Sequence, residues 1–155
     1  TKREGVRLES EIRSDASPLS GLISRVLSAS GGVRFMRDPT RGGLGATLNE
    51  IVQGTDLGIS IDETSLPIRK GVRAACELLG LDPIYLANEG KVVIIAGRYE
   101  AGKVLRTMRR HRLGKNSRII GRVEKGPERM VYLNTSIGSK RIVAMPSGEQ
   151  VPRIC

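Results

Sequence analysis

Four consecutive β-branched residues, Val92 to Ile95, constrain the fold of this chain more than any other feature of its sequence. A continuous apolar run of this kind is typical of a strand that is buried on both faces. Strand-like and helix-like patterns alternate along the rest of the chain. Together these patterns indicate one α/β-type unit of 155 residues, which is long enough to enclose a real core.

Apolar spacing predicts four helices and six strands. The first helix begins with Ser17 as its cap and Pro18 at its first position, and it ends at Ser30-Gly31-Gly32. The other predicted helices span residues 44–52, 68–79 and 99–112. The predicted strands span residues 33–36, 57–61, 91–96, 117–123, 129–133 and 141–144.

Composition limits the partners of the chain. Aromatic residues make up only 3% of the sequence, so the core must be aliphatic. The net charge is +10, and basic residues cluster between positions 106 and 118. This cluster suits either a nucleic acid or a solvated helix face that docks an acidic partner. Nucleic-acid modules usually add stacking aromatics or a known motif, and the chain has neither, so binding to nucleic acid is disfavoured.

The two cysteines have different settings. Cys76 lies in an apolar helical stretch and is expected to be a small buried hydrophobe. Cys155 is the last residue, where a chain end can reach into another protein's active site. Arg153 should favour its nucleophilic thiolate, whereas the chain's own terminal carboxylate should oppose it. The alternative is a leftover cysteine without a function. Two cysteines make no disulfide framework, which fits a reducing cytoplasm.

A glycine-rich loop, Asp38-Pro39-Thr40-Arg41-Gly42-Gly43, joins a predicted strand to a predicted helix. Gly42 and Gly43 would let backbone N–H groups approach an anion at the start of the helix. Thr40 could add a hydroxyl group, and the guanidinium group of Arg41 could make two parallel hydrogen bonds to the anion. The alternative is a tight strand-to-helix turn that Asp38 caps, with no ligand.

A second polar turn, Ala87-Asn88-Glu89-Gly90, precedes the β-branched run. Glu89 is either a surface carboxylate or a base held at the entrance of the strand. Asn88 could hydrogen-bond a carboxamide. The turn alone does not decide between these roles.

The order of these motifs resembles that of the hydrogenase maturation family HypE, and the likeness covers essentially the whole chain. The glycine-rich loop is shared with the wider aminoimidazole ribonucleotide synthetase and selenophosphate synthetase superfamily, whereas the terminal Pro-Arg-Ile-Cys is far more specific to HypE. The resemblance implies an α+β, αβα-layered C-terminal domain over residues 1–146, with a mixed β-sheet flanked by helices. A flexible tail, residues 147–155, would then carry Cys155. The matching segments are Ser17-Pro18-Leu19, residues 35–44, Leu48-Asn49-Glu50, Ala87-Asn88-Glu89-Gly90 and residues 152–155.

The resemblance also implies a reaction. The carbamoyltransferase HypF would load a carbamoyl group onto Cys155, and ATP-dependent dehydration would convert it to a thiocyanate. The cyano group would then pass to iron on a HypC–HypD complex. Glu89 matches the family glutamate assigned near the dehydration step, with Asn88 beside it. The loop residues Asp38, Thr40, Arg41, Gly42 and Gly43 would help to frame the nucleotide phosphates.

One departure from the family limits this expectation. The family's carboxylates for ATP and Mg²⁺ lie mainly on an N-terminal domain that this chain lacks, and that domain also forms most of the family's dimer contact. The chain alone is therefore expected to be inactive. Two alternatives remain open: a fragment of another ATP-dependent small-molecule synthetase of the superfamily, and a basic module that binds RNA or an acidic protein. We expect no membrane contact.

Overall fold

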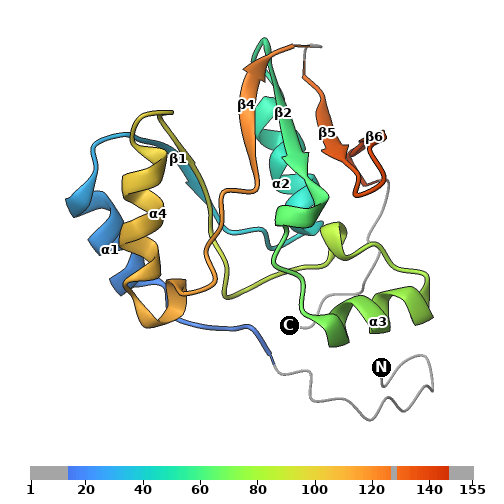
Figure 1. Cartoon of the computed structure of the whole chain (residues 1–155), viewed down its shortest axis with the longest axis horizontal. Helices are drawn as coiled ribbons and strands as arrows, with labels where there is room; N and C mark the ends of the chain where they lie inside the picture. The colour runs from blue at the N-terminus through green and yellow to red at the C-terminus, as the bar shows by residue number, and fades with distance from the viewer. Residues whose placement is uncertain (1–13, 127–128, 147–155) are drawn as a thin grey trace.

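The computed structural model describes residues 14–126 and 129–146, and Figure 1 shows their arrangement. It contains helices α1 (Ser20–Ala29), α2 (Gly43–Val52), α3 (Lys70–Leu79) and α4 (Ala101–Arg109). Its strands are β1 (Val33–Arg37), β2 (Leu57–Asp62), β3 (Val93–Ala96), β4 (Gly121–Lys125), β5 (Val131–Asn134) and β6 (Lys140–Ile142). Three short 3₁₀ turns, η1 (Glu63–Ser65), η2 (Pro83–Tyr85) and η3 (Arg112–Gly114), lie between them. The predicted α+β class is confirmed.

The larger sheet has the strand order β4-β2-β5-β6. β2 runs parallel to β5, whereas β2–β4 and β5–β6 are antiparallel pairs. The predicted mixed sheet is therefore confirmed, and the structure adds the strand order. Helix α2 packs against β2 and β5 and closes the main core. That core is aliphatic, as the scarcity of aromatic residues predicts; its buried members are Leu48, Val52, Ile59, Ile61, Ile84, Val131, Leu133 and Val143.

β1 and β3 form a separate, two-stranded antiparallel sheet. Helix α4 contacts β3, and α1 and α4 lie side by side in Figure 1. The prediction that the β-branched run is buried on both faces is wrong, because every residue of β3 is only half-buried. The physical reason is that, among the described residues, β3 pairs only with β1 in a two-stranded sheet against which α4 packs, so that this small sheet is not enclosed between layers on both faces.

The predicted start of the first helix is also wrong. Helix α1 begins at Ser20 with Leu19 at its N-cap, and no side chain caps it. Ser17 instead belongs to a segment that packs closely on Gly90. At the other end the prediction holds, since the helix stops at Ser30 before the two glycines.

Several element boundaries differ from the sequence pattern by two residues or more, most clearly those of α4 and β4. Helix α4 ends at Arg109, and the predicted last turn is a separate 3₁₀ turn in which the His111 side chain accepts a hydrogen bond from Leu113 N–H. β4 begins four residues after its predicted start, and β6 is shorter than predicted. No helix among the described residues is both long enough and apolar enough to cross a membrane.

Candidate functional site

The glycine-rich loop leads from β1 into α2. Gly42, the N-cap of α2, and Gly43 have left-handed backbone angles, with φ of 65° and 59°. A Cβ at Gly42 would overlap the side chain of Ala46, and one at Gly43 would overlap the carbonyl oxygen of Leu86. Both positions therefore require glycine for backbone conformation and for close packing.

Asp38 does not cap α2, because no side chain makes a cap hydrogen bond there. The capping alternative for this loop is therefore wrong, although the tight strand-to-helix turn itself is present. Within the loop, Gly43 N–H donates to the carbonyl of Thr40 at 3.3 Å. The start of α2 thus keeps amide groups without a side-chain cap, which is the feature of a helix N-terminus that suits an anion.

An ion pair brackets the loop. Arg37, at the end of β1, pairs with Glu50 on α2, so that the strand and the helix on either side of the loop are joined. The neighbouring Asn49 donates from its side-chain amide to the carbonyls of Gly45 (2.9 Å) and Val143 (2.8 Å). These contacts give structural roles to Asn49 and Glu50, for which the sequence alone indicated none.

The structure brings the two polar turns together. The backbone N–H of Asn88 donates to the carbonyl of Pro39 at 3.0 Å. Asp38 and Glu89 line the same pocket, which has a volume of about 440 Å³. Thr40, Arg41, Gly42 and Gly43 do not line it. The pocket is formed by α1, the end of β1 and the turn before β3, through Ser17, Leu19, Ser20, Ile23, Met36, Arg37, Asp38, Glu89, Lys91 and Val92.

Lys91 joins this region to the segment before α1. Lys91 Nζ lies 2.8 Å from a carboxylate oxygen of Asp15, and it also donates to the side-chain oxygen of Asn88. Sequence reasoning did not single out Asp15 or Lys91. A cation three residues after Asn88 was the available signal, but its partner at residue 15 is distant in sequence.

Of the two cysteines, the structure describes Cys76. Cys76 is buried in α3, as predicted, and burial raises the pKa of its thiol above the ordinary value. Its thiolate is therefore disfavoured, which suits a structural residue. Cys155 and the predicted tail, residues 147–155, lie outside the described residues.

No group of three or more His, Cys, Asp or Glu side chains in residues 14–126 and 129–146 could hold a metal ion. The described part of the chain thus offers a carboxylate beside a pocket and an uncapped helix start. Glu89 and Asp38 line the pocket, whereas the start of α2, which lacks a side-chain cap, is not part of its lining. These features suit one domain of a synthetase that uses a nucleotide.

A family comparison agrees with this assignment. Residues 4–134 match the family described as AIR synthase related protein, C-terminal domain, and the chain belongs to this family. Its resemblance to the HypE proteins is confirmed by a relative named carbamoyl dehydratase HypE from Bradyrhizobium diazoefficiens. The two are 51% identical over 156 residues, which is 100% of this chain and 45% of the relative.

Solved structures show the same likeness. A HypE–HypF complex matches with a TM-score of 0.87 and 41% identity, over 94% of this chain and 47% of that chain. A HypE structure in complex with ATP matches with a TM-score of 0.90 and 36% identity, over 99% and 47%. This chain therefore spans about half the length of the proteins it matches.

Proposed function

We propose that this chain is the C-terminal part of a carbamoyl dehydratase that serves the maturation of nickel–iron hydrogenases. In this proposal Cys155 carries a carbamoyl group, which is dehydrated with ATP to a thiocyanate, the source of the cyanide ligand of iron. The observation that carries the proposal is the 51% identity, along all of this chain, to a relative named carbamoyl dehydratase HypE. The pocket that Glu89 lines supports the assignment of the chemistry to this part of the chain.

The proposed dehydration needs a phosphoryl donor and a base. ATP, when bound, supplies a phosphoryl group that turns the carbamoyl oxygen into a leaving group. Both protons must then leave the nitrogen as its triple bond to carbon forms, and the C–O bond breaks with release of phosphate. Glu89 is exposed at the pocket rim and is the carboxylate we assign to this proton removal.

The residues of the chain fit ATP only in part. The uncapped start of α2, with the loop of Asp38, Thr40, Arg41, Gly42 and Gly43, suits the phosphates of a nucleotide. A carboxylate cluster for Mg²⁺ is missing from the described residues. We therefore assign Mg²⁺ and most of the ATP contacts to the part of the relatives' length that this chain does not span.

The partners follow from the same proposal. HypF, which is bound in one matching structure, would load Cys155. A HypC–HypD complex would accept the cyano group, and the full-length protein would form a dimer through its other half. These steps would take place in the cytoplasm.

A Glu89→Gln variant of the full-length protein tests the base assignment. Glutamine keeps the shape of the side chain but cannot accept the proton, and a positioned base typically contributes about 10²–10⁴-fold to a rate. We expect the variant to accumulate the carbamoylated protein and to dehydrate it at least 100-fold more slowly than the wild type. Intact mass after ATP addition measures this as the delayed loss of one water.

Three controls accompany this test. Glu77→Gln changes an exposed glutamate on α3 and should dehydrate at the wild-type rate. Cys155→Ala should not be loaded at all, whereas Cys76→Ala should be loaded normally. Wild-type dehydration by a well-folded Glu89→Gln protein, or carbamoyl loading of Cys155→Ala, would refute the corresponding assignment.

A further inference from the structure

The segment from Ser14 to Ser17 packs directly on the turn that carries Glu89. A Cβ at Gly90 would overlap the carbonyl oxygen of Asp15 and would lie 3.1 Å from the backbone nitrogen of Ser17. The absence of a side chain at residue 90 is therefore what lets the segment pass over the turn. The segment has its own internal bond, from Ala16 N–H to the Ser14 hydroxyl at 3.2 Å.

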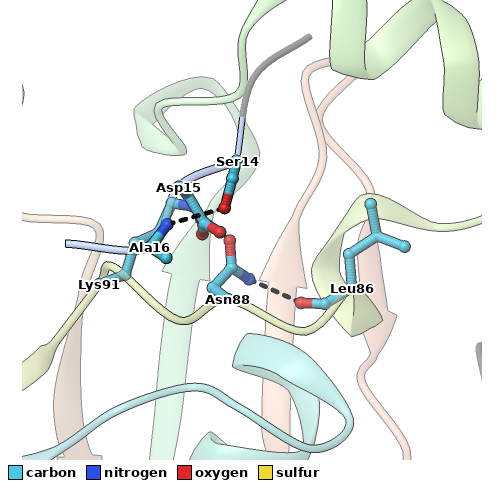
Figure 2. Close-up of polar contacts among 6 residues, drawn as sticks. All are labelled: Ser14, Asp15, Ala16, Leu86, Asn88 and Lys91. Atoms are coloured by element: carbon cyan, nitrogen blue, oxygen red, sulfur yellow. Dashed lines mark hydrogen bonds and ion pairs between the residues drawn. The ribbon is translucent and has the colours of Figure 1, made fainter. Parts of the chain in front are cut away.

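Lys91 joins the segment to the turn from the other side. Its ammonium group lies 2.8 Å from Asp15 Oδ2 and donates to Asn88 Oδ1. Figure 2 shows Asp15, Asn88 and Lys91 pointing toward one another. One cation therefore connects residues that are 76 positions and 3 positions away from it in sequence.

Asn88 is held at three points. Its side-chain amide donates to the carbonyl of Leu86 at 2.6 Å, its side-chain oxygen accepts from Lys91, and its backbone N–H donates to Pro39. Figure 2 shows the reach of this side chain to Leu86. Both ends of the amide are thus engaged within the chain, which favours a role in fixing the turn over a direct contact with a carboxamide.

The charge of Asp15 supports the same arrangement. Partial burial raises the pKa of Asp15, but the hydrogen bond and positive charge of Lys91, together with hydrogen bonds from the backbone of Asp15 and Glu89, outweigh this and lower the pKa below its ordinary value of 3.8. Asp15 is therefore ionised at neutral pH and attracts Lys91. Glu89 lies between the two anchored positions, Asn88 and Gly90, and both Glu89 and Lys91 line the pocket.

We infer that Lys91 is a positioning residue for Glu89: by binding Asp15 and Asn88 together, it fixes the turn on which Glu89 stands. This inference rests on the proposed function, in which Glu89 is the base. Lys91 acts through the backbone of the turn and does not itself exchange a proton with the substrate. These contacts matter because the rate of proton transfer depends on holding the base within about 0.5 Å of its productive position.

The test compares single-turnover dehydration of carbamoylated full-length protein in three Lys91 and Asp15 variants. Lys91→Met removes the ammonium group but keeps much of the apolar stem, and should slow dehydration about 10- to 100-fold. Lys91→Arg can still pair with Asp15 and donate to Asn88, and should recover most of the rate. Asp15→Asn should slow the step less than Lys91→Met, because the bond from Lys91 to Asn88 remains. Lys103→Met, an exposed lysine on α4, is the matched control and should match the wild type.

A second readout separates this inference from the base assignment. Backbone amide hydrogen exchange at residues 88–91 should be faster in Lys91→Met than in the wild type, and unchanged in Glu89→Gln. Carbamoyl loading of Cys155 should be equal in all variants, since it needs only the thiol and the transferase.

Two results would overturn the inference. The first is wild-type dehydration by Lys91→Met in a preparation whose Glu89→Gln protein is slow. The second is slow dehydration by Lys91→Met without any change in exchange at residues 88–91, because Lys91 would then act directly on the substrate. If Glu89→Gln itself dehydrates normally, the proposed base fails instead, and the exchange measurement alone decides whether Lys91 fixes the turn.

Discussion

Gly43 is a position where both the backbone conformation and the packing of the loop require glycine. Its φ of 59° is unfavourable for any residue with a Cβ, and the carbonyl groups of Ile84 and Leu86 occupy the space that a Cβ would need. A change at this glycine therefore disturbs the packing of the loop in addition to any contact that the loop makes with phosphate.

We predict that Gly43→Ala destabilises the protein by about 2–5 kcal/mol. A left-handed backbone costs a residue with a Cβ roughly 1–2 kcal/mol, and a clash in a packed region adds about 1–3 kcal/mol. Urea unfolding, followed by circular dichroism, measures the change in the free energy of unfolding.

Two other glycines separate these contributions. Gly54 has a φ of 80° with open space around it, so Gly54→Ala should show only the backbone cost. Gly31 has open space and no left-handed angle, so Gly31→Ala should change stability by less than about 0.5 kcal/mol. Equal stability of the Gly43 and Gly31 variants would contradict the proposed packing of the loop.

At the scale of elements, the end of β6 is tied to α2 by a single side chain. Asn49 stands on α2 and binds the carbonyl of Val143, the residue after β6, while its second amide hydrogen binds Gly45. Val143 is fully buried, and its backbone N–H donates to Val131 on β5. The short final strand therefore depends on a helix for part of its attachment.

We expect Asn49→Ala to lower the free energy of unfolding by about 1–3 kcal/mol, because it leaves the buried carbonyl of Val143 without its side-chain partner. Asn116→Ala, at an exposed position, is the control and should have almost no effect. Thermal melts give the comparison, and hydrogen exchange should locate the loosening at residues 140–144. A loss of stability without faster exchange there would argue against this link.

The outline of most elements could be predicted from the sequence, because each pattern reflects local geometry. The spacing of Leu48, Ile51 and Val52 predicts α2, and the αL residue Gly80 ends α3 as its composition suggests. The start of α1 could not be predicted in this way. A contact between Ser17 and Gly90 takes precedence there over the local capping preference of a serine before a proline.

At the scale of the whole molecule, the chain contains only part of the proposed machinery. Glu89 and Asp38 line one pocket, and the turn of Glu89 is hydrogen-bonded to the loop before α2, whereas no metal-binding cluster lies among residues 14–126 and 129–146. This division agrees with a chain that spans about half the length of its relatives.

We therefore predict that the purified chain hydrolyses ATP no faster than background in the presence of Mg²⁺, measured as phosphate release. Adding the other half of the protein should restore ATP-dependent dehydration of the loaded cysteine. Glu89→Gln within the same reconstituted protein serves as the inactive control. Robust Mg²⁺-dependent turnover by the chain alone would place the catalytic groups within it.

Some features of the candidate site could be predicted from the sequence, and others came only from the tertiary structure. The sequence alone determined which residue types could act: a terminal thiol, a glycine-rich turn before a helix, and a glutamate before a strand. It also determined the aliphatic core and most helices and strands, since these depend on neighbours a few residues apart. Only the tertiary structure decided that Asp15 and Lys91 meet, that the two polar turns share a contact, and that β3 is half-exposed. The physical reason is that these features depend on contacts between residues as many as 76 positions apart, which no local pattern encodes.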